Sequence, residues 1–350
     1  MNRRDNILRA VRFETPEYIP MAFHINGACW HHYPQEHLVE LMLNHKLLFP
    51  GYKPPKLPHT PAFAPMQRKG VKFVDDWGCT WETTDDGITG TVTLHPLADW
   101  TKLDSYSPPD PARVSGNGPI DWERITKRMA EIRASGGLAS GGLRHGHTFL
   151  ALCDIHGYQE TIFDMADDEP KLWKLVEMLE TFNMGIVKRY MDAGVEWMSY
   201  PEDLGMQTGP MLSPDQFRKF IKPSYQRLMK PARDKGCIVH MHSDGHIQDL
   251  ADDLVDGGVE VLNLQDLVNG IDWIRRKYAG KVCIDLDIDR QQITRFGTPK
   301  QIDDLIKEEV TKLATKKGGL TMIFGLYPGT PLENVKALMD AMERYATYYS

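Results

Sequence analysis

The chain contains 350 residues, of which 41% are hydrophobic and 25% are charged, which is the composition of an ordinary globular protein. Its formal net charge of -7 argues against nucleic acid as a ligand, because a phosphate-binding surface needs clustered Lys and Arg. No segment reaches the roughly 20 consecutive apolar residues that span a bilayer, so we expect no membrane association.

The N-terminal segment, residues 1–13, is charged and predicts a helix rather than a secretory signal, because it has no apolar core. The five cysteines of the chain are scattered, odd in number and without a CxxC pair. This usage is typical of free thiols in a reducing compartment rather than of a disulfide framework. We therefore expect a cytoplasmic protein.

The N-terminal part predicts one strand followed by irregular structure. Residues 18–25 predict the first strand, and the proline-rich residues 51–66 predict a long excursion over one end of a barrel. Residues 71–99 alternate in polarity and predict a small β-hairpin insertion, with Asp86 and Gly87 as its turn.

Farther along the chain, short apolar runs alternate with helical patterns. The predicted strands lie at 195–200, 237–242, 259–264, 282–287 and 320–325. Glycines mark the predicted helix ends at residues 194, 236, 257, 280 and 318. This rhythm is typical of parallel βα units. The sequence therefore predicts an α/β fold, a (β/α)8 TIM barrel that residues 1–350 form as a single domain.

The ends of the predicted strands carry mainly acids and imidazoles, and few Ser, Cys or Lys nucleophiles. In a parallel barrel these positions gather at one face, where active sites form. The candidates lie at or just beyond the end of each predicted strand: His24 and Trp30 for 18–25, Glu202, Asp203 and Gln207 for 195–200, His242 and Asp244 for 237–242, Gln265 for 259–264, Asp287 for 282–287, and Tyr327 for 320–325.

The segment VHMHSDGH, residues 239–246, is the sharpest pattern. On a strand, His240 and His242 point to the same side and Asp244 can follow them at the strand end. Zinc takes about four ligands from His, Cys and carboxylate groups. His242 and Asp244 supply two, and a third would come from Glu202, from His240 or from an acid at 285 or 287. We expect His240, one layer deeper, to be a hydrogen-bonded core residue.

Two further segments have less specific patterns. CWHHY, residues 29–33, predicts a helix over the pocket, with a substrate lid as the alternative reading. Residues 136–149 are rich in glycine but lack the P-loop lysine and the GxGxxG spacing, so they indicate a flexible loop rather than a phosphate site.

Several motifs together resemble the uroporphyrinogen decarboxylase superfamily, and the resemblance is densest over residues 199–345. They are PEDLGMQTGPMLSP (201–214), HSDG (242–245), GVEVLN (258–263) and GTPLEN (329–334). VDDWGCTWE (74–82) and HPLAD (95–99) are similar to the methyltransferase-like branch of that superfamily. The resemblance implies the barrel fold and, at most, a homodimer.

The superfamily holds two chemistries. Porphyrinogen decarboxylases bind their many substrate carboxylates with an arginine-rich loop, but the corresponding HINGACWHHYP (24–34) has no arginine. Cobalamin-dependent methyltransferases hold zinc with one histidine and two cysteines. These map onto His242, Asp244 and Phe324, so a carboxylate and an aromatic ring replace the two thiolates. The resemblance therefore favours methyl transfer with a harder metal site.

These observations predict an enzyme that demethylates a small methoxylated or methylamine-type substrate onto a corrinoid carried by a partner protein. Glu202, Asp203, His242 and Asp244 are the predicted catalytic residues, with Glu202 as acid or third metal ligand. His24, Trp30, Gln207, Gln265, Asp287 and Tyr327 are the predicted substrate-binding residues. The alternatives are a decarboxylase or lyase acting on a small carboxylate, and a non-catalytic ligand-binding barrel.

Overall fold

The structure is a computed structural model that describes residues 2–348. The chain forms two compact units. Unit 1 comprises Met1–Val71, Thr83–Gly90 and Gln265–Ser350, and unit 2 comprises Lys72–Glu82 and Thr91–Leu264. Within residues 2–348, no helix combines the length and the apolar character needed to cross a membrane.

Unit 1 contains three parallel strands in the order β1-β11-β10. They are β1 (Met21–Ile25), β11 (Leu320–Leu326) and β10 (Cys283–Asp287). The register pairs Phe23 with Phe324 on the central strand β11, and both side chains are buried. Buried aromatic side chains on neighbouring strands are typical of a parallel sheet that helices cover.

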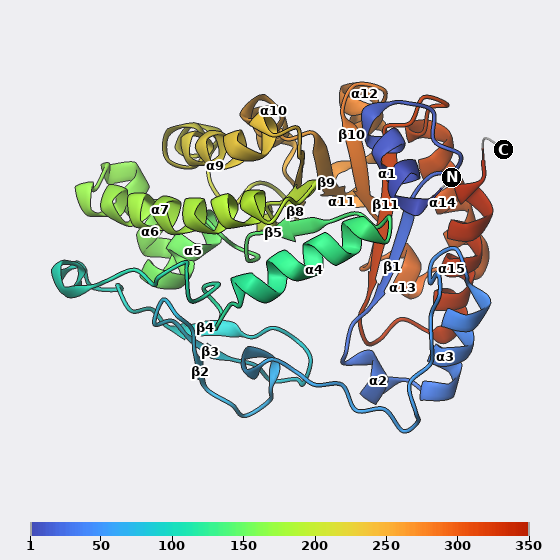
Figure 1. The fold of residues 1–350 in the computed structure, drawn as a ribbon, viewed down its shortest axis with the longest axis horizontal. Coiled ribbons are helices and arrows are strands. Elements are labelled where there is room, and N and C mark those ends of the chain that lie inside the picture. Colours follow the sequence, from blue (N-terminus) through green and yellow to red (C-terminus); the bar gives the residue numbers. More distant parts are fainter. Residues whose placement is uncertain (1, 349–350) are drawn as a thin grey trace. The chain divides into compact units, whose positions relative to one another are not determined.

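Helices α1 and α15 of unit 1 pack beside these strands (Figure 1), and α14 and α15 pack against each other. In chain order they are α1 (Arg3–Arg12), α2 (Cys29–His32), α3 (Gln35–Asn44), the 3-10 helix η1 (Pro65–Gln67), α11 (Asp266–Asn269), α12 (Ile271–Tyr278), α13 (Ile293–Phe296), α14 (Pro299–Leu313) and α15 (Leu332–Ala346).

Unit 2 contains parallel strands in the order β9-β8-β6-β5, and a short strand β7 also pairs with β8. They are β9 (Val261–Gln265, whose last residue belongs to unit 1), β8 (Ile238–Asp244), β6 (Trp197–Ser199), β5 (Ser140–Gly142) and β7 (Glu202–Asp203). A separate antiparallel sheet consists of β2 (Phe73–Val74), β3 (Thr80–Glu82) and β4 (Thr91–Leu94).

The long helix α7 packs against α9 in unit 2 (Figure 1). The helices of this unit are η2 (Trp100–Ser105), α4 (Trp122–Ala134), α5 (Phe149–His156), α6 (Tyr158–Asp167), α7 (Pro170–Asp192), α8 (Pro214–Gln216), the π-helix η3 (Phe217–Ile221), α9 (Lys222–Asp234) and α10 (Gln248–Gly257).

The structure confirms each strand that the sequence predicts, with bounds that shift by a few residues. Strand β8 continues two residues beyond the predicted end, which brings Asp244 into the strand. The hairpin expected at 71–99 is confirmed and carries the additional strand β2. The prediction of Gly257 as a helix end is wrong by one residue, because Gly258 has the left-handed φ of 115°. All five cysteines are free and buried.

Candidate functional site

The short strand β7 sets the positions of two neighbouring acids in unit 2. Its register with β8 pairs Glu202 with Ser243 and Asp203 with Asp244. Because successive side chains of a strand point to opposite faces, the two acids of β7 have different surroundings.

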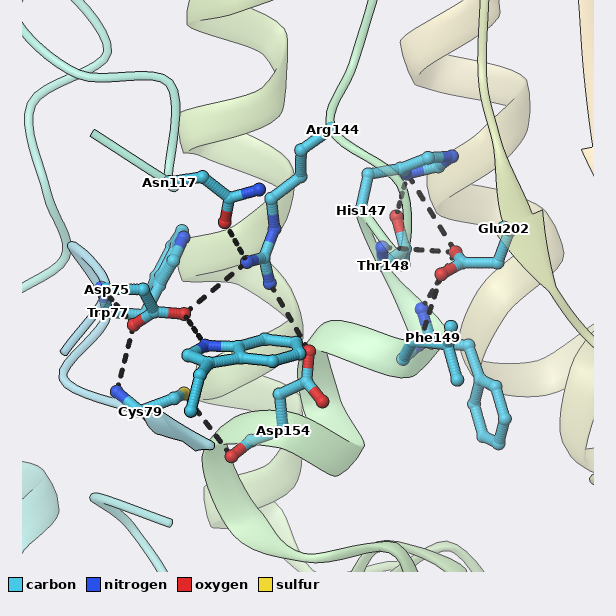
Figure 2. Close-up of polar contacts among 12 residues, drawn as sticks. Asp75, Trp77, Cys79, Asn117, Arg144, His147, Thr148, Phe149, Asp154 and Glu202 are labelled. Carbon is cyan, nitrogen blue, oxygen red and sulfur yellow. Dashed lines mark hydrogen bonds and ion pairs between the residues drawn. The ribbon is translucent and has the colours of Figure 1, made fainter. Parts of the chain in front are cut away.

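Glu202 is fully buried, and its carboxylate accepts four hydrogen bonds, of which Figure 2 shows those from Thr148 and Phe149. The backbone N–H groups of Thr148, Phe149 and Leu150 donate to it over 3.1, 3.0 and 3.1 Å, and the Tyr225 hydroxyl donates over 2.6 Å. These N–H groups belong to the N-terminus of α5, which has no partner for them within the helix. The contacts of Glu202 therefore favour a capping role over the predicted role of metal ligand or acid, which stays a prediction.

Asp203 faces two imidazoles instead. Its Oδ1 lies 3.2 Å from Nε2 of His145 and 3.5 Å from Nε2 of His242. Nε2 of His242 also lies 3.5 Å from Oδ1 of Asp244. The exposed fractions of the four side chains run from 21% for His242 to 51% for His145, so solvent and small molecules can reach them.

The ring of His242 is oriented by the neighbouring strand. The register of β8 and β9 places Asn263 beside His242, and Nδ1 of His242 hydrogen-bonds to the side-chain oxygen of Asn263. An amide oxygen can only accept, so Nδ1 carries the proton of the neutral ring. The lone pair of Nε2 then points toward Asp203 and Asp244, as in a metal-binding histidine whose other nitrogen is held by an outer partner.

The acids and imidazoles of this cluster shift one another's pKa values. Burial lowers the pKa of His242, but the hydrogen bond with Asp203 and the charge of Asp244 outweigh it and raise that pKa to about 9. Burial likewise lowers the pKa of His145, and the hydrogen bond with Asp203 raises it above the ordinary value. Burial would raise the pKa of Asp203, yet its bonds with the two imidazoles hold that pKa well below the usual range. The carboxylate of Asp203 and the two imidazoles therefore each favour the charged form of the other.

The same atoms fit a divalent metal. One ligand atom each from His145, Asp203 and His242 lie within 4.8 Å of one another. Zinc with N and O ligands at ~2.0–2.1 Å in tetrahedral geometry keeps its ligand atoms about 3.3–3.5 Å apart. The contacts of 3.2 and 3.5 Å at Asp203 match this spacing, and Asp244 is not part of this group. The donor set of imidazoles and carboxylates is one that zinc accepts.

Two further predicted residues lie in unit 2. His240 makes the expected hydrogen bond, because its Nδ1 lies 2.9 Å from the Ser199 hydroxyl, but it is half-buried rather than a core residue. Gln207 is exposed in the segment that follows β7.

The other predicted substrate-binding residues lie in unit 1. Burial lowers the pKa of His24 on β1, with Asp285 opposing the shift. Trp30 on α2 packs edge-on against His59, and Gln265 is buried at the end of β9. Asp287 is buried and accepts a hydrogen bond of 3.0 Å from Arg290.

Phe324 lies near the end of β11 and Tyr327 directly follows that strand, but the two side chains differ in exposure. Tyr327 is 46% exposed and lines a cavity of 590 Å³ together with His31 and His32 of α2. Phe324, where the methyltransferase pattern has a cysteine, is buried against Phe23 at 5.1 Å and offers no donor atom to a metal.

His145 is a site residue that the sequence analysis missed. It lies three residues after β5, a strand of three residues in the glycine-rich stretch that was interpreted as a flexible loop. Applying the strand-end rule to Ser140–Gly142 would have identified it.

Comparison with known proteins gives the chain two kinds of relatives. Methylcobamide:CoM methyltransferase MtaA of Methanosarcina barkeri is 28% identical over 144 residues, which cover 39% of this chain and 38% of that protein. A uroporphyrinogen decarboxylase of Thermus thermophilus is 25% identical over 185 residues, which cover 51% of this chain and 50% of that protein. The chain thus spans half or less of the length of these curated relatives.

The fold has a full-length counterpart among solved structures. A methyltransferase from Methanosarcina mazei matches with a TM-score of 0.66 at 19% identity, and the match covers 99% of both chains. The α/β architecture with parallel strands is therefore shared with that protein. The family model described as "Uroporphyrinogen decarboxylase (URO-D)" matches residues 76–345. The chain belongs to the URO-D family.

Proposed function

We propose that the protein is a methyltransferase that removes a methyl group from a small methoxylated or methylamine-type substrate and transfers it to a corrinoid on a partner protein. The pair of His242 and Asp203 carries this proposal, because donor atoms 3.5 Å apart can hold a metal at a solvent-accessible position. The likeness to a relative named for methylcobamide supports the role of a corrinoid. The proposal includes the fold, a (β/α)8 barrel that the chain forms as one domain.

His242 and Asp203 would hold a divalent ion, with zinc as the expected metal. Such an ion supplies Lewis acidity that polarises the oxygen or nitrogen bearing the methyl group. Asn263 keeps Nε2 of His242 directed at the site, and Asp244, which is 39% exposed, would deliver a proton to the leaving atom. His24, Trp30, Gln207, Gln265, Asp287 and Tyr327 remain the proposed substrate contacts.

The test is methyl transfer. Purified protein, reduced cobalamin and a panel of methoxyaromatics and methylamines should form methylcobalamin, which is followed by its absorbance spectrum. The variant His242→Ala should lower the rate by at least ~100-fold, as expected for loss of a ligand to a catalytic ion. His37→Ala, which replaces an exposed histidine of α3, should keep the wild-type rate. Wild-type protein that forms no methylcobalamin with any donor would overturn the proposal.

One observation favours a second candidate, decarboxylation of a small carboxylate. The pKa values of His145 and His242 are both raised, which favours the ring forms that donate hydrogen bonds to a substrate carboxylate. Release of carbon dioxide from such a substrate without any corrinoid would identify this chemistry. If His242→Ala changed no measured turnover at all, the third alternative, a non-catalytic ligand-binding barrel, would be favoured.

A further inference from the structure

We propose that His145 is a ligand of the metal site and that the buried Arg144 is its positioning residue. This inference rests on the metal site of the proposed function. It starts from the loop that joins β5 to α5, residues 143–148, because this loop carries His145 and is held at each end by contacts that leave that side chain little freedom.

Backbone hydrogen bonds place the loop beside the segment that leads into β7. The N–H of Leu143 donates to the carbonyl oxygen of Ser199 over 3.0 Å, and the N–H of Gly146 donates to that of Pro201 over 3.0 Å. Gly146 has a φ of 70°, and a Cβ added there would lie 2.9 Å from Cβ of Leu150. The two bonds bracket His145 and bring it next to Asp203.

The downstream end of the loop is fixed by groups that do not face the metal site. Asn183 of α7 donates to the carbonyl oxygen of His147 over 2.7 Å. Glu202 accepts the N–H of Thr148 at the start of α5 (Figure 2). This end therefore moves only if helix α5 loses its cap.

The upstream end depends on the side chain of Arg144, which is 5% exposed and points into a polar cluster that includes Asp75, Asn117 and Asp154 (Figure 2). Nη1 donates to Oδ1 of Asn117 over 3.1 Å and lies 3.6 Å from the carboxylate of Asp75. Nη2 lies 3.8 Å from the carboxylate of Asp154.

The cluster around Arg144 is itself rigid. The carboxylate of Asp75 is fully buried and accepts the N–H groups of Trp77 and Cys79 and the indole N–H of Trp81, each over 2.9 Å. The guanidinium is thus held by groups whose own positions are fixed, and it transmits that constraint to the adjacent residue His145. Outer partners that orient metal ligands in this way commonly change metal affinity ~10–100-fold when they are altered.

The experiment measures zinc affinity by competition with a chromophoric chelator, with the unfolding midpoint recorded for every variant. His145→Ala should raise the dissociation constant for zinc at least ~10-fold, and Arg144→Lys, which keeps the charge but loses the planar fork, should raise it ~10-fold. Asn117→Ala removes one partner of the guanidinium and leaves the charge in place. Asn117→Ala replaces Arg144→Lys in the experiment if Arg144→Lys folds poorly, and it should also raise the dissociation constant for zinc. His37→Ala should bind zinc as the wild type does.

The double variant Arg144→Lys/His145→Ala separates positioning from general stability. If Arg144 acts through His145, the dissociation constant of the double variant for zinc lies within about threefold of that of His145→Ala, since the effects of coupled residues are not additive.

The proposal is overturned if His145→Ala binds zinc as tightly as the wild type, if Arg144→Lys only lowers the unfolding midpoint, or if the two losses of zinc affinity are additive. If the zinc affinities change as expected but the protein transfers no methyl group, only the proposed function is overturned. Methyl transfer by a wild type that binds no zinc would overturn this inference alone.

Discussion

Asp154 is a carboxyl group whose ionisation opposes folding. Burial raises its pKa to about 6, and Arg144 at 3.8 Å offsets only part of that effect. Because this pKa is higher in the folded chain than in the unfolded one, the folded state binds the proton more tightly. The stabilising contribution of Asp154 is therefore complete below pH ~4 and is lost as the pH rises to about 6.

We therefore expect Asp154→Asn to gain stability relative to the wild type as the pH rises through this window. The difference in free energy of unfolding between the two proteins should change by up to about 3 kcal/mol from pH 4 to pH 7 and stay constant above it. Urea unfolding at a series of pH values measures it. Asp249→Asn, which replaces an exposed acid of α10, serves as the control. Parallel stability curves for Asp154→Asn and the wild type would contradict the expectation.

The residues of the site differ in how well the sequence could identify them. His242 and Asp244 lie at the end of a strand that the apolar residues Ile238, Val239 and Met241 indicate, so their position could be predicted. Asp203 could be selected for the same reason, but its neighbour Glu202 could not be distinguished from it. That distinction depends on which face of β7 each side chain takes and on the unpaired N–H groups of α5, a helix that is distant in sequence.

At the scale of elements, helix α5 depends on a cap from outside its own sequence. Thr148 precedes the helix but makes no capping hydrogen bond with its side chain, and Glu202 supplies the acceptor instead. A carboxylate near a helix N-terminus also interacts favourably with the helix dipole.

Glu202→Ala should therefore destabilise the protein by about 3 kcal/mol, since it leaves buried N–H groups and the Tyr225 hydroxyl without an acceptor. The shift of the urea unfolding midpoint at constant m-value measures this loss. Glu123→Ala, at an exposed position in the first turn of α4, should change stability by less than about 0.5 kcal/mol. Equal effects of the two substitutions would refute the capping role.

Short elements were the ones that the sequence could not predict. Strands β5 and β7 contain three and two residues, so neither is long enough to show an alternating or continuous apolar pattern. Each is defined by pairing with a neighbour, β6 in one case and β8 in the other. Conversely, the capping box of Ser213 and Gln216 at the start of α8 involves residues only three apart, so the local sequence encodes it.

At the scale of the whole molecule, the parallel α/β class could be predicted because short runs rich in apolar residues alternate with helical patterns along the chain. The grouping of the chain into two units could not, because both units draw on segments that are far apart in sequence. Unit 1 combines the N-terminal strand β1 with the C-terminal strand β11, and only their pairing brings these ends of the chain together.

A single domain predicts a single cooperative unfolding transition. Six of the eight tryptophans lie in unit 2, and Trp30 and Trp273 lie in unit 1, so tryptophan fluorescence mainly reports on unit 2. Far-ultraviolet circular dichroism reports on the helices of both units. We expect the two signals to give the same urea midpoint, and a fluorescence transition that differs from the circular dichroism transition would show that the units unfold separately.

The burial of every cysteine has a practical consequence. Burial raises the pKa of the Cys29 and Cys237 thiols to about 12, so the reactive thiolate is scarce at these positions as well as shielded. A cysteine introduced at an exposed position such as Glu123 would react with a maleimide long before any native thiol. A fluorophore can therefore be attached at one chosen place on the native chain without first replacing its own sulfur atoms.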